Sequence, residues 1–209
     1  MKRFCYPEVR LLKKLLLATG NQAKVREYRS LLQGLPFRLV TPKEQGITTA
    51  VSEVGGNLEE NARLKAVTLA AESQLVALAD DSGLEVDILG GEPGCLSARC
   101  AGEGASDEER ISYLLARLEG VPWEKRSARF RCVIAIATPE GRLGLCSGEC
   151  RGLVTLEPVG EGGFGYDPVF YLLELAKTMA ELSLGAKNRI SHRGQAARQV
   201  PKVLAELGL

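Results

Sequence analysis

Two adjacent carboxylates, Asp80 and Asp81, follow the apolar run 75–79 and are the clearest candidates for chemistry in this sequence. Neighbouring carboxylates at the end of a buried strand are unfavourable unless a cation or hydrogen-bond donors meet them. Because consecutive strand residues point to opposite faces, one of the two can enter a cleft, and we expect it to be Asp81. With Glu53 as a second acid, Asp81 would present the oxygen ligands that Mg²⁺ prefers. The residues alone fit an exposed Asp-Asp-Ser-Gly turn equally well.

A phosphate site is indicated near the N-terminus. There an apolar run ends at Thr19, Gly20 and Asn21, and a basic, helical stretch containing Lys24 follows. The start of a helix exposes unpaired backbone N–H groups and the positive end of the helix dipole, which attract phosphate. Taken alone, such a stretch is more often an ordinary capped turn with a solvated lysine. The other candidate sites decide between the two.

The segment 160–170 reads GEGGFGYDPVF and combines glycines with aromatic residues. By count it contains G-x-G-x-x-G, the dinucleotide-binding fingerprint. That fingerprint opens a helix, whereas Asp167 and Pro168 follow here. We therefore predict a loop whose glycines allow close approach to a flat ligand, with Phe164 and Tyr166 able to stack on a base.

A second anion-binding corner is predicted around Ser191, which we expect to cap a helix. Its basic residues are Lys187, Arg189, His192 and Arg193, and His192 is the single histidine of the chain. A basic cluster is more often a solvated face, and a lone histidine is more often structural. This corner gains weight only in combination with the other two.

Alternating apolar strands and amphipathic helices must position these residues, and they predict an α/β fold. The expected strands are at 14–18, 75–81 and 128–159, and the expected helices at 22–33, 58–73, 106–120 and 191–209. Asn21, Asn57 and a Ser106 capping box with Glu109 mark the first three helix starts. A turn at 139–141 makes the section 128–159 antiparallel, and Pro201 is able to kink the last helix.

Composition excludes several classes of protein. The 209 residues carry 27 basic and 26 acidic side chains, so no field of one sign attracts a membrane or a nucleic acid, and neither is expected as a partner. The apolar runs are shorter than the roughly 20 residues of a membrane span. The six cysteines lack the spacing of a zinc site. We expect them to be reduced, buried small residues, which favours a cytoplasmic protein.

Five motifs in order make the combination specific: ATGNQAKVREY, ENARLKA, ADDSGLEVDILGGEPGCLSARCAGEGASD, GGFGYDPVF and KNRISHRGQA. From Leu15 to the C-terminus the chain strongly resembles the inosine/xanthosine triphosphate pyrophosphatase family. The resemblance implies a single domain over 15–209. The residues before it, 1–14, carry five basic groups, and from them we expect a poorly ordered extension. The implied fold is an elongated mixed, partly antiparallel sheet flanked by helices, with two lobes around a central nucleotide cleft. The implied protein is a homodimer that hydrolyses ITP, dITP and XTP to the monophosphate and pyrophosphate with Mg²⁺.

The resemblance also implies roles for individual residues. Glu53 and Asp81 would bind Mg²⁺, and Asp81 would also orient or deprotonate the attacking water. Lys65 would place a positive charge above the α-phosphate, while Ser82 would contact the substrate and, with Asp80, shape the turn. The residues implied to hold the triphosphate are Thr19, Gly20, Asn21 and Lys24. The residues implied to bind the base and ribose are Phe164, Gly165, Tyr166, Asp167, Lys187, His192 and Arg193.

Two other functions are compatible with these residues. A regulator that binds purine triphosphates without cleaving them would use the same anion-binding corners, but it has little use for Glu53, Asp80 and Asp81 together. A phosphotransferase would need a phosphate-loop lysine motif, which this sequence lacks. Relative to the family, Cys100 stands where an aromatic residue is common, and the N-terminal extension has no counterpart.

Overall fold

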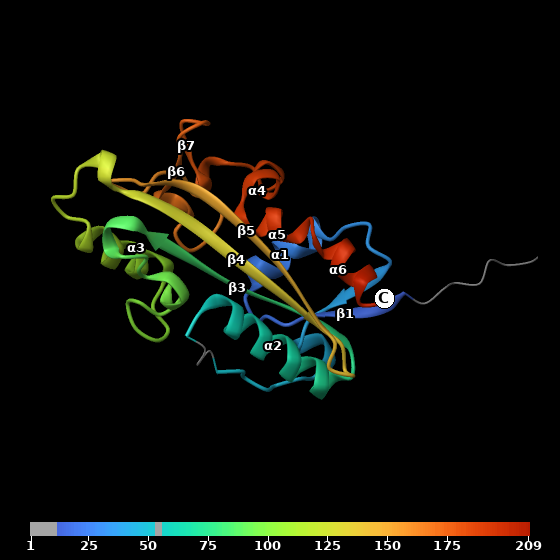
Figure 1. Cartoon of the computed structure of the whole chain (residues 1–209). Coiled ribbons are helices and arrows are strands. Elements are labelled where there is room, and N and C mark those ends of the chain that lie inside the picture. Colours follow the sequence, from blue (N-terminus) through green and yellow to red (C-terminus); the bar gives the residue numbers. More distant parts are fainter. Residues whose placement is uncertain (1–11, 53–55) are drawn as a thin grey trace, which may run out of the picture.

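A seven-stranded sheet forms the centre of the chain. The computed structural model describes residues 12–52 and 56–209, and Glu53 and Cys5 lie outside these ranges. The strand order is β2-β1-β3-β4-β5-β6-β7 (Figure 1). The strands are β1 (Lys13–Leu17), β2 (Phe37–Val40), β3 (Val76–Val86), β4 (Ser127–Ala137), β5 (Leu143–Val154), β6 (Phe170–Leu172) and β7 (Lys177–Thr178). β1 is parallel to β2 and β3, and all later neighbours are antiparallel, so the predicted mixed sheet is confirmed.

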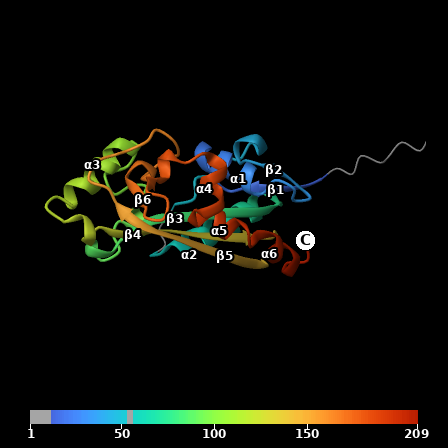
Figure 2. The same cartoon turned by 90° about the horizontal axis from the view of Figure 1, so that it is seen from above.

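Helices cover both faces of this sheet. They are α1 (Gln22–Leu31), α2 (Leu58–Ser73), α3 (Asp107–Arg117), α4 (Leu184–Ile190), α5 (His192–Ala197) and α6 (Val200–Glu206). α2 lies below the long strands in Figure 1, and α1, α5 and α6 lie above them. α3 packs at the far end, where Ile111 and Leu114 share a core with Leu84 and Phe130. The view in Figure 2 shows the elongated form, with α3 and α6 at opposite ends.

Asp80 and Asp81 lie in the middle of β3, not at its end. The strand continues as far as Val86, and both aspartates pair with β4. The predicted strand end and Asp-Asp-Ser-Gly turn are therefore wrong. Gly83 is a strand residue, and its role is steric. A Cβ atom there would lie 2.1 Å from the carbonyl oxygen of Gly94, so only glycine allows the segment around Gly94 to pack this close to the strand.

The predicted helix starts are confirmed, whereas the C-terminal part differs. Asn21 and Asn57 cap α1 and α2 through their side chains, and Ser106 forms its capping box at α3. One kinked helix from 191 was predicted, but α5 and α6 are separate, with Pro201 in the first turn of α6. Proline lacks the N–H of a helix interior and suits a helix start. Ser191 caps α5 as predicted and also ends α4, which the pattern did not indicate.

Neither disulfides nor membrane-spanning helices occur in the part of the chain that the structure describes. The five described cysteines are free thiols: Cys95, Cys100, Cys132, Cys146 and Cys150. Cys132, Cys146 and Cys150 are buried as predicted, whereas Cys95 and Cys100 are only half-buried. Burial raises the pKa of Cys132 to about 12. No described helix combines the length and the apolar character needed to cross a bilayer.

Candidate active site

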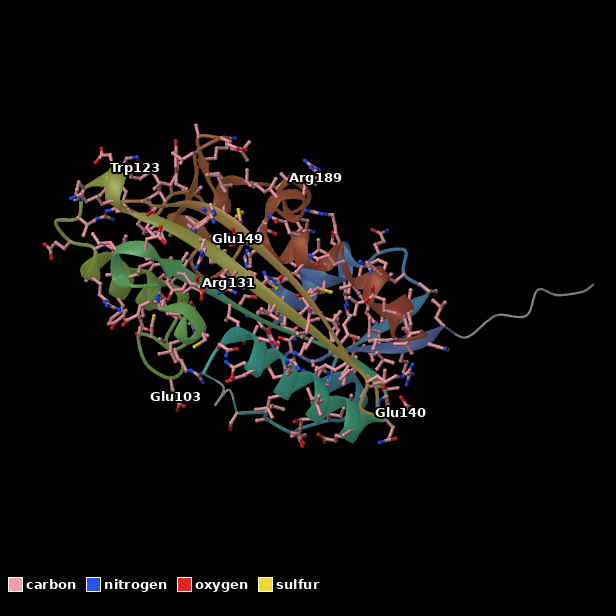
Figure 3. All side chains as sticks on the ribbon, viewed as in Figure 1. Glu103, Trp123, Arg131, Glu140, Glu149 and Arg189 are labelled. Carbon is pink, nitrogen blue, oxygen red and sulfur yellow. The ribbon has the colours of Figure 1, made fainter. Side chains whose placement is uncertain are left out.

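A cavity of about 260 Å³ gathers most of the predicted site residues from segments far apart in the sequence. Those that line it are Asn21, Lys24, Asp81, Ser82, Phe164, Gly165, Tyr166, Asp167, Lys187, His192 and Arg193. Thr19, Gly20 and Lys65 are not in its wall, although Lys65 reaches Asp81 from α2. Arg189 is exposed at the surface (Figure 3). The two charged lining residues that the sequence did not indicate are Asp107 and Arg110 of α3.

A larger hollow of about 610 Å³ lies along β4 and β5, but it gathers none of the predicted residues. Its wall includes Arg129, Glu149 and Arg151. Arg151 pairs with Glu149 at 3.1 Å, and Glu149 stands opposite Arg131 in the neighbouring strand (Figure 3). Paired exposed charges are typical of a solvated sheet face, but the same wall also contains Leu172, Leu173 and Leu175.

The predicted phosphate corner is built as a capped helix start. Asn21 Oδ1 accepts hydrogen bonds from the backbone N–H groups of Ala23 (2.8 Å) and Lys24 (3.2 Å). Thr19 Oγ1 accepts one from the N–H of Asn21 (3.1 Å). These three N–H groups are used within the turn, whereas the ammonium group of Lys24 is a cation that can meet an anion. It lies 2.6 Å from Asp80.

Asp81 is the carboxylate of the pair that lines the cavity. Lys65 Nζ lies 2.7 Å from one of its oxygens, and Asn61 Nδ2 donates to the other at 3.2 Å. Lys65 also donates to the backbone oxygen of Asp80 (2.9 Å), which fixes the lysine against β3. A carboxylate held in this way beside a cation can bind a metal ion or accept a proton from water.

Asp80 faces the other side of β3 and belongs to a buried chain of alternating charges. The chain runs through Lys24, Asp80, Arg193, Glu27, Lys187 and Asp167 in that order. The first four contacts measure 2.6, 3.0, 2.7 and 2.7 Å. Burial raises the pKa of Asp80, but the positive charges of Lys24 and Arg193 outweigh burial and hold this pKa well below its ordinary value. The aspartate therefore stays ionised, and each buried charge is balanced by a neighbour.

Glu27 is the member of this chain that the sequence did not indicate. It is 4% exposed, and its two carboxylate oxygens lie 2.7 Å from Arg193 Nη1 and 2.7 Å from Lys187 Nζ. The sequence feature that could have indicated its burial is its position on α1, beside the buried Tyr28 and one turn after Lys24. An ionisable residue at a buried helix position requires a partner, but the sequence does not name that partner.

The glycine-rich segment forms the predicted loop and places Phe164 over two cations. The centroid of its ring lies 4.6 Å from Lys187 Nζ and 5.3 Å from Arg193 Cζ. Tyr166 is buried, its hydroxyl donates to a backbone oxygen at 2.9 Å, and this hydroxyl lies 2.9 Å from Cys100 Sγ. Of the two predicted stacking residues, both of which line the cavity, Phe164 is half-buried and Tyr166 is buried.

His192 lines the cavity as a neutral ring. It is buried and stacks on Phe130, with ring centroids 4.7 Å apart and an interplanar angle of 16°. Burial, followed by the positive charges of Arg193 and Lys187, holds the pKa of His192 well below 6.5. Near neutral pH the ring adds no charge to the cations around it.

The lowered pKa of His192 predicts that the free energy of unfolding falls as the pH drops below about 6.5. Below that pH the unfolded chain binds a proton that the folded chain does not, so the stability is fully present above it. The loss is at most about 1.4 kcal/mol per pH unit. Urea unfolding of the wild type and of His192→Asn, between about pH 5 and pH 7, measures both slopes. A shallower slope is expected in the variant, and equal slopes would contradict the assignment.

One described residue is a candidate ligand for a divalent cation. The Asp81 carboxylate supplies the hard oxygen ligand that Mg²⁺ takes, and it lines the cavity. Across 12–52 and 56–209, no three His, Cys, Asp or Glu side chains form a group able to hold a metal ion. Glu53, the second predicted ligand, lies outside the described residues.

Comparison with known proteins identifies the family of this chain. The model of the Ham1 family matches residues 15–203. A dITP/XTP pyrophosphatase of Desulforamulus reducens is 49% identical over 194 residues, which is 93% of this chain and 96% of that protein. One of Geobacter sulfurreducens is 50% identical over 183 residues, covering 88% and 92%. The structure of a HAM1 protein from Coxiella burnetii superposes with a TM-score of 0.84 at 41% identity, covering 93% and 99%. The chain therefore belongs to the Ham1 family.

Proposed function

We propose that this chain hydrolyses the non-standard purine nucleotides ITP, dITP and XTP to the monophosphate and pyrophosphate, and so cleanses the nucleotide pool. The observation that carries the proposal is a single cavity lined by Asp81 and Lys24 and also by Phe164, Lys187 and Arg193. Lys24 and Asp81 suit the binding and hydrolysis of a triphosphate, and Phe164, Lys187 and Arg193 suit the binding of a purine base. The relatives named dITP/XTP pyrophosphatase support the same substrate class.

Hydrolysis takes place at the phosphate end of the cavity. Asp81 orients a water molecule and accepts its proton as the water oxygen attacks the α-phosphorus. The bond from the α-phosphorus to the bridging oxygen breaks in line, and pyrophosphate leaves. Lys65, held against Asp81 at 2.7 Å, stabilises the negative charge that develops on the α-phosphate. The residues that seat the triphosphate in this proposal are Thr19, Gly20, Asn21, Lys24 and Ser82.

The base is selected at the other end. Lys187 and Arg193 carry only hydrogen-bond donors, which suit the 6-oxygen of hypoxanthine or xanthine. Adenine has an amino group at that position, so donors would face donors and ATP is rejected. Phe164 stacks on the purine, and neutral His192 shapes the site. Gly165, Tyr166 and Asp167 form part of the wall beside them.

A magnesium ion, homodimerisation and a cytoplasmic location belong to the same proposal. Asp81 and Glu53 would hold Mg²⁺, which when bound neutralises phosphate charge and polarises the phosphoryl group. The proposed unit is one pyrophosphatase domain over 15–209 that pairs as a homodimer. Five free thiols among the described residues support a reducing compartment.

Hydrolysis of ITP in ¹⁸O-labelled water tests the proposal. Attack at the α-phosphorus places one labelled oxygen in IMP and none in pyrophosphate, which mass spectrometry of both products reads directly. Label in inorganic phosphate, with IDP as the second product, would mean that the reaction takes place at the terminal phosphorus and would contradict the proposed chemistry. Tight binding of intact ITP would instead indicate a regulator.

Lys65→Ala is expected to have a larger effect on kcat than on the free energy of unfolding. Loss of the cation at the α-phosphate is expected to lower kcat about 100-fold. Loss of its hydrogen bonds to Asp81 lowers the free energy of unfolding by about 2 kcal/mol, and alanine suits a helix interior. Rates per folded molecule and urea midpoints measure the two effects.

Arg63→Ala is the matched control for Lys65→Ala, because Arg63 lies on the same helix in an exposed pair with Glu59. It is expected to change neither kcat nor the urea midpoint appreciably. A Lys65→Ala protein that unfolds readily yet keeps its rate per folded molecule would contradict the role given to Lys65.

A further inference from the structure

Asp107, the first residue of α3, lies outside the roles assigned so far, yet it contacts the loop that carries Phe164. We propose that Asp107, oriented by Arg110, is a positioning residue that fixes the Phe164 ring for the purine. The inference rests on the proposed function, because it concerns the base end of the same cavity.

The loop cannot fix Phe164 by its own backbone. Gly160, Gly163 and Gly165 have φ angles of 88°, 75° and 62°, in the left-handed region that glycine adopts readily. Glycines on both sides of Phe164 leave the local chain with many accessible conformations. The ring direction must therefore be set by contacts from outside these residues.

Two carboxylates supply such contacts to the backbone N–H groups on either side of the Cα atom of Phe164. Asp167 Oδ2 accepts the backbone N–H of Phe164 at 2.9 Å, and Asp107 Oδ2 accepts the N–H of Gly165 at 2.6 Å. These two N–H groups flank the Cα atom of Phe164, so holding both restricts the φ and ψ angles of that residue. Asp167 is anchored in turn by Lys187. Asp107 comes from α3, 58 residues earlier in the sequence.

Arg110 holds Asp107 in the required orientation. Its Nη1 donates to Asp107 Oδ1 at 2.7 Å, which leaves Oδ2 for Gly165, and its Nη2 donates to the backbone oxygen of Ala105. The Nε atom of Arg110 is buried and has no hydrogen-bond partner among the described residues. A buried donor without a partner is unfavourable. The guanidinium of Arg110 therefore keeps its hydrogen bond to Asp107 although its own Nε–H is left without an acceptor in the described part of the chain. Both side chains line the cavity.

Asp107 is not needed to start α3. Ser106 caps the helix, and Glu109 completes the capping box. Glu108 lies in the same first turn and is exposed. Glu108→Ala therefore removes the same charge from the same turn without touching the loop, and it is the matched control for Asp107→Ala.

Calorimetric titration with two probes tests the positioning role. IMP requires the base end, whereas inorganic tripolyphosphate requires only the phosphate end. Asp107→Ala is expected to weaken IMP binding about tenfold and to leave tripolyphosphate binding unchanged, because one charge-assisted hydrogen bond to the loop is lost. With ITP, KM is expected to rise about tenfold while kcat stays within about twofold. Asp107→Asn, which keeps the size and one acceptor, is expected to give an intermediate loss.

A double-mutant cycle with Phe164→Ala completes the test, because a residue that acts through Phe164 has nothing left to position in that background. Asp107→Ala is expected to add no further loss there. An equal loss with and without Phe164, weakened tripolyphosphate binding, or wild-type affinity of Asp107→Ala for IMP would each overturn the positioning role alone. Wild-type protein that binds tripolyphosphate but not IMP would overturn the proposed function and this inference with it.

Discussion

Asp81→Asn is expected to lower kcat for ITP at least about 1,000-fold while the protein stays folded. The substitution keeps the shape of the side chain and an acceptor for Lys65, but it removes the charge that accepts a proton and attracts a cation. Lys65 and Asn61 would still contact this position on β3. Single-turnover rates with ITP, together with circular dichroism and thermal unfolding of the same samples, measure both halves of the expectation.

The matched control for Asp81→Asn is Glu85→Gln. Glu85 lies on the same strand and the same face as Asp81, and it pairs with Arg129 at 2.7 Å and with Arg131 at 3.0 Å outside the 260 Å³ cavity. Its loss is expected to leave kcat within about twofold, since neither Glu85 nor its partners line the cavity. Undiminished turnover by Asp81→Asn would show that another group activates the water.

Glu27→Gln is expected to lower the free energy of unfolding by about 3 kcal/mol, because it leaves Arg193 and Lys187 buried without their shared counter-charge. Arg29→Gln is the control on the same helix. Arg29 is about half exposed in its pair with Glu44, so its loss is expected to change stability by no more than about 0.5 kcal/mol. Urea unfolding at neutral pH measures both. Equal effects of the two substitutions would mean that the buried charges do not depend on one another.

The effect of Glu27→Gln is also expected to depend on pH. Burial raises the pKa of Glu27, but Arg193 and Lys187 outweigh burial and lower this pKa from 4.5. A lowered carboxyl pKa contributes stability that is present above the unfolded value and is lost as the pH falls through the folded one. The difference between wild type and Glu27→Gln is therefore expected to shrink below about pH 4.5. A difference that stays constant there would contradict the ionised state of Glu27.

Local signals in the sequence were sufficient where local chemistry decides the structure. Asn21, Asn57 and Ser106 start helices because their side chains satisfy N–H groups two or three residues away, which a pattern can reveal. The turn between β4 and β5 is also local, because glycine readily adopts the φ of 89° found at Gly141. Phe164 and Lys187 were indicated by residue type and spacing, and the fold brings them into one cavity.

Long-range contacts set the features that the pattern missed. Asp80 and Ser82 suggested a turn, but continuous pairing with β4 keeps them in a strand. Glu27 is explained by Arg193, 166 residues away, and Asp107 by Gly165. In the sequence, Glu27 is recognisable only as a charged residue at a helix position where an apolar residue is expected. Asp107 carries no such signal. Identifying their partners requires the folded chain.

Product analysis by ion exchange tests the central claim most directly. Purified protein is incubated with ITP, XTP, GTP or ATP, with and without Mg²⁺, and the monophosphate, diphosphate, pyrophosphate and phosphate are resolved. The account predicts IMP and pyrophosphate in equal amounts, formed only with Mg²⁺ and at least about 100-fold faster than AMP from ATP. Equal rates with ITP and ATP would contradict base selection by Lys187 and Arg193, and IDP with phosphate would contradict attack at the α-phosphorus.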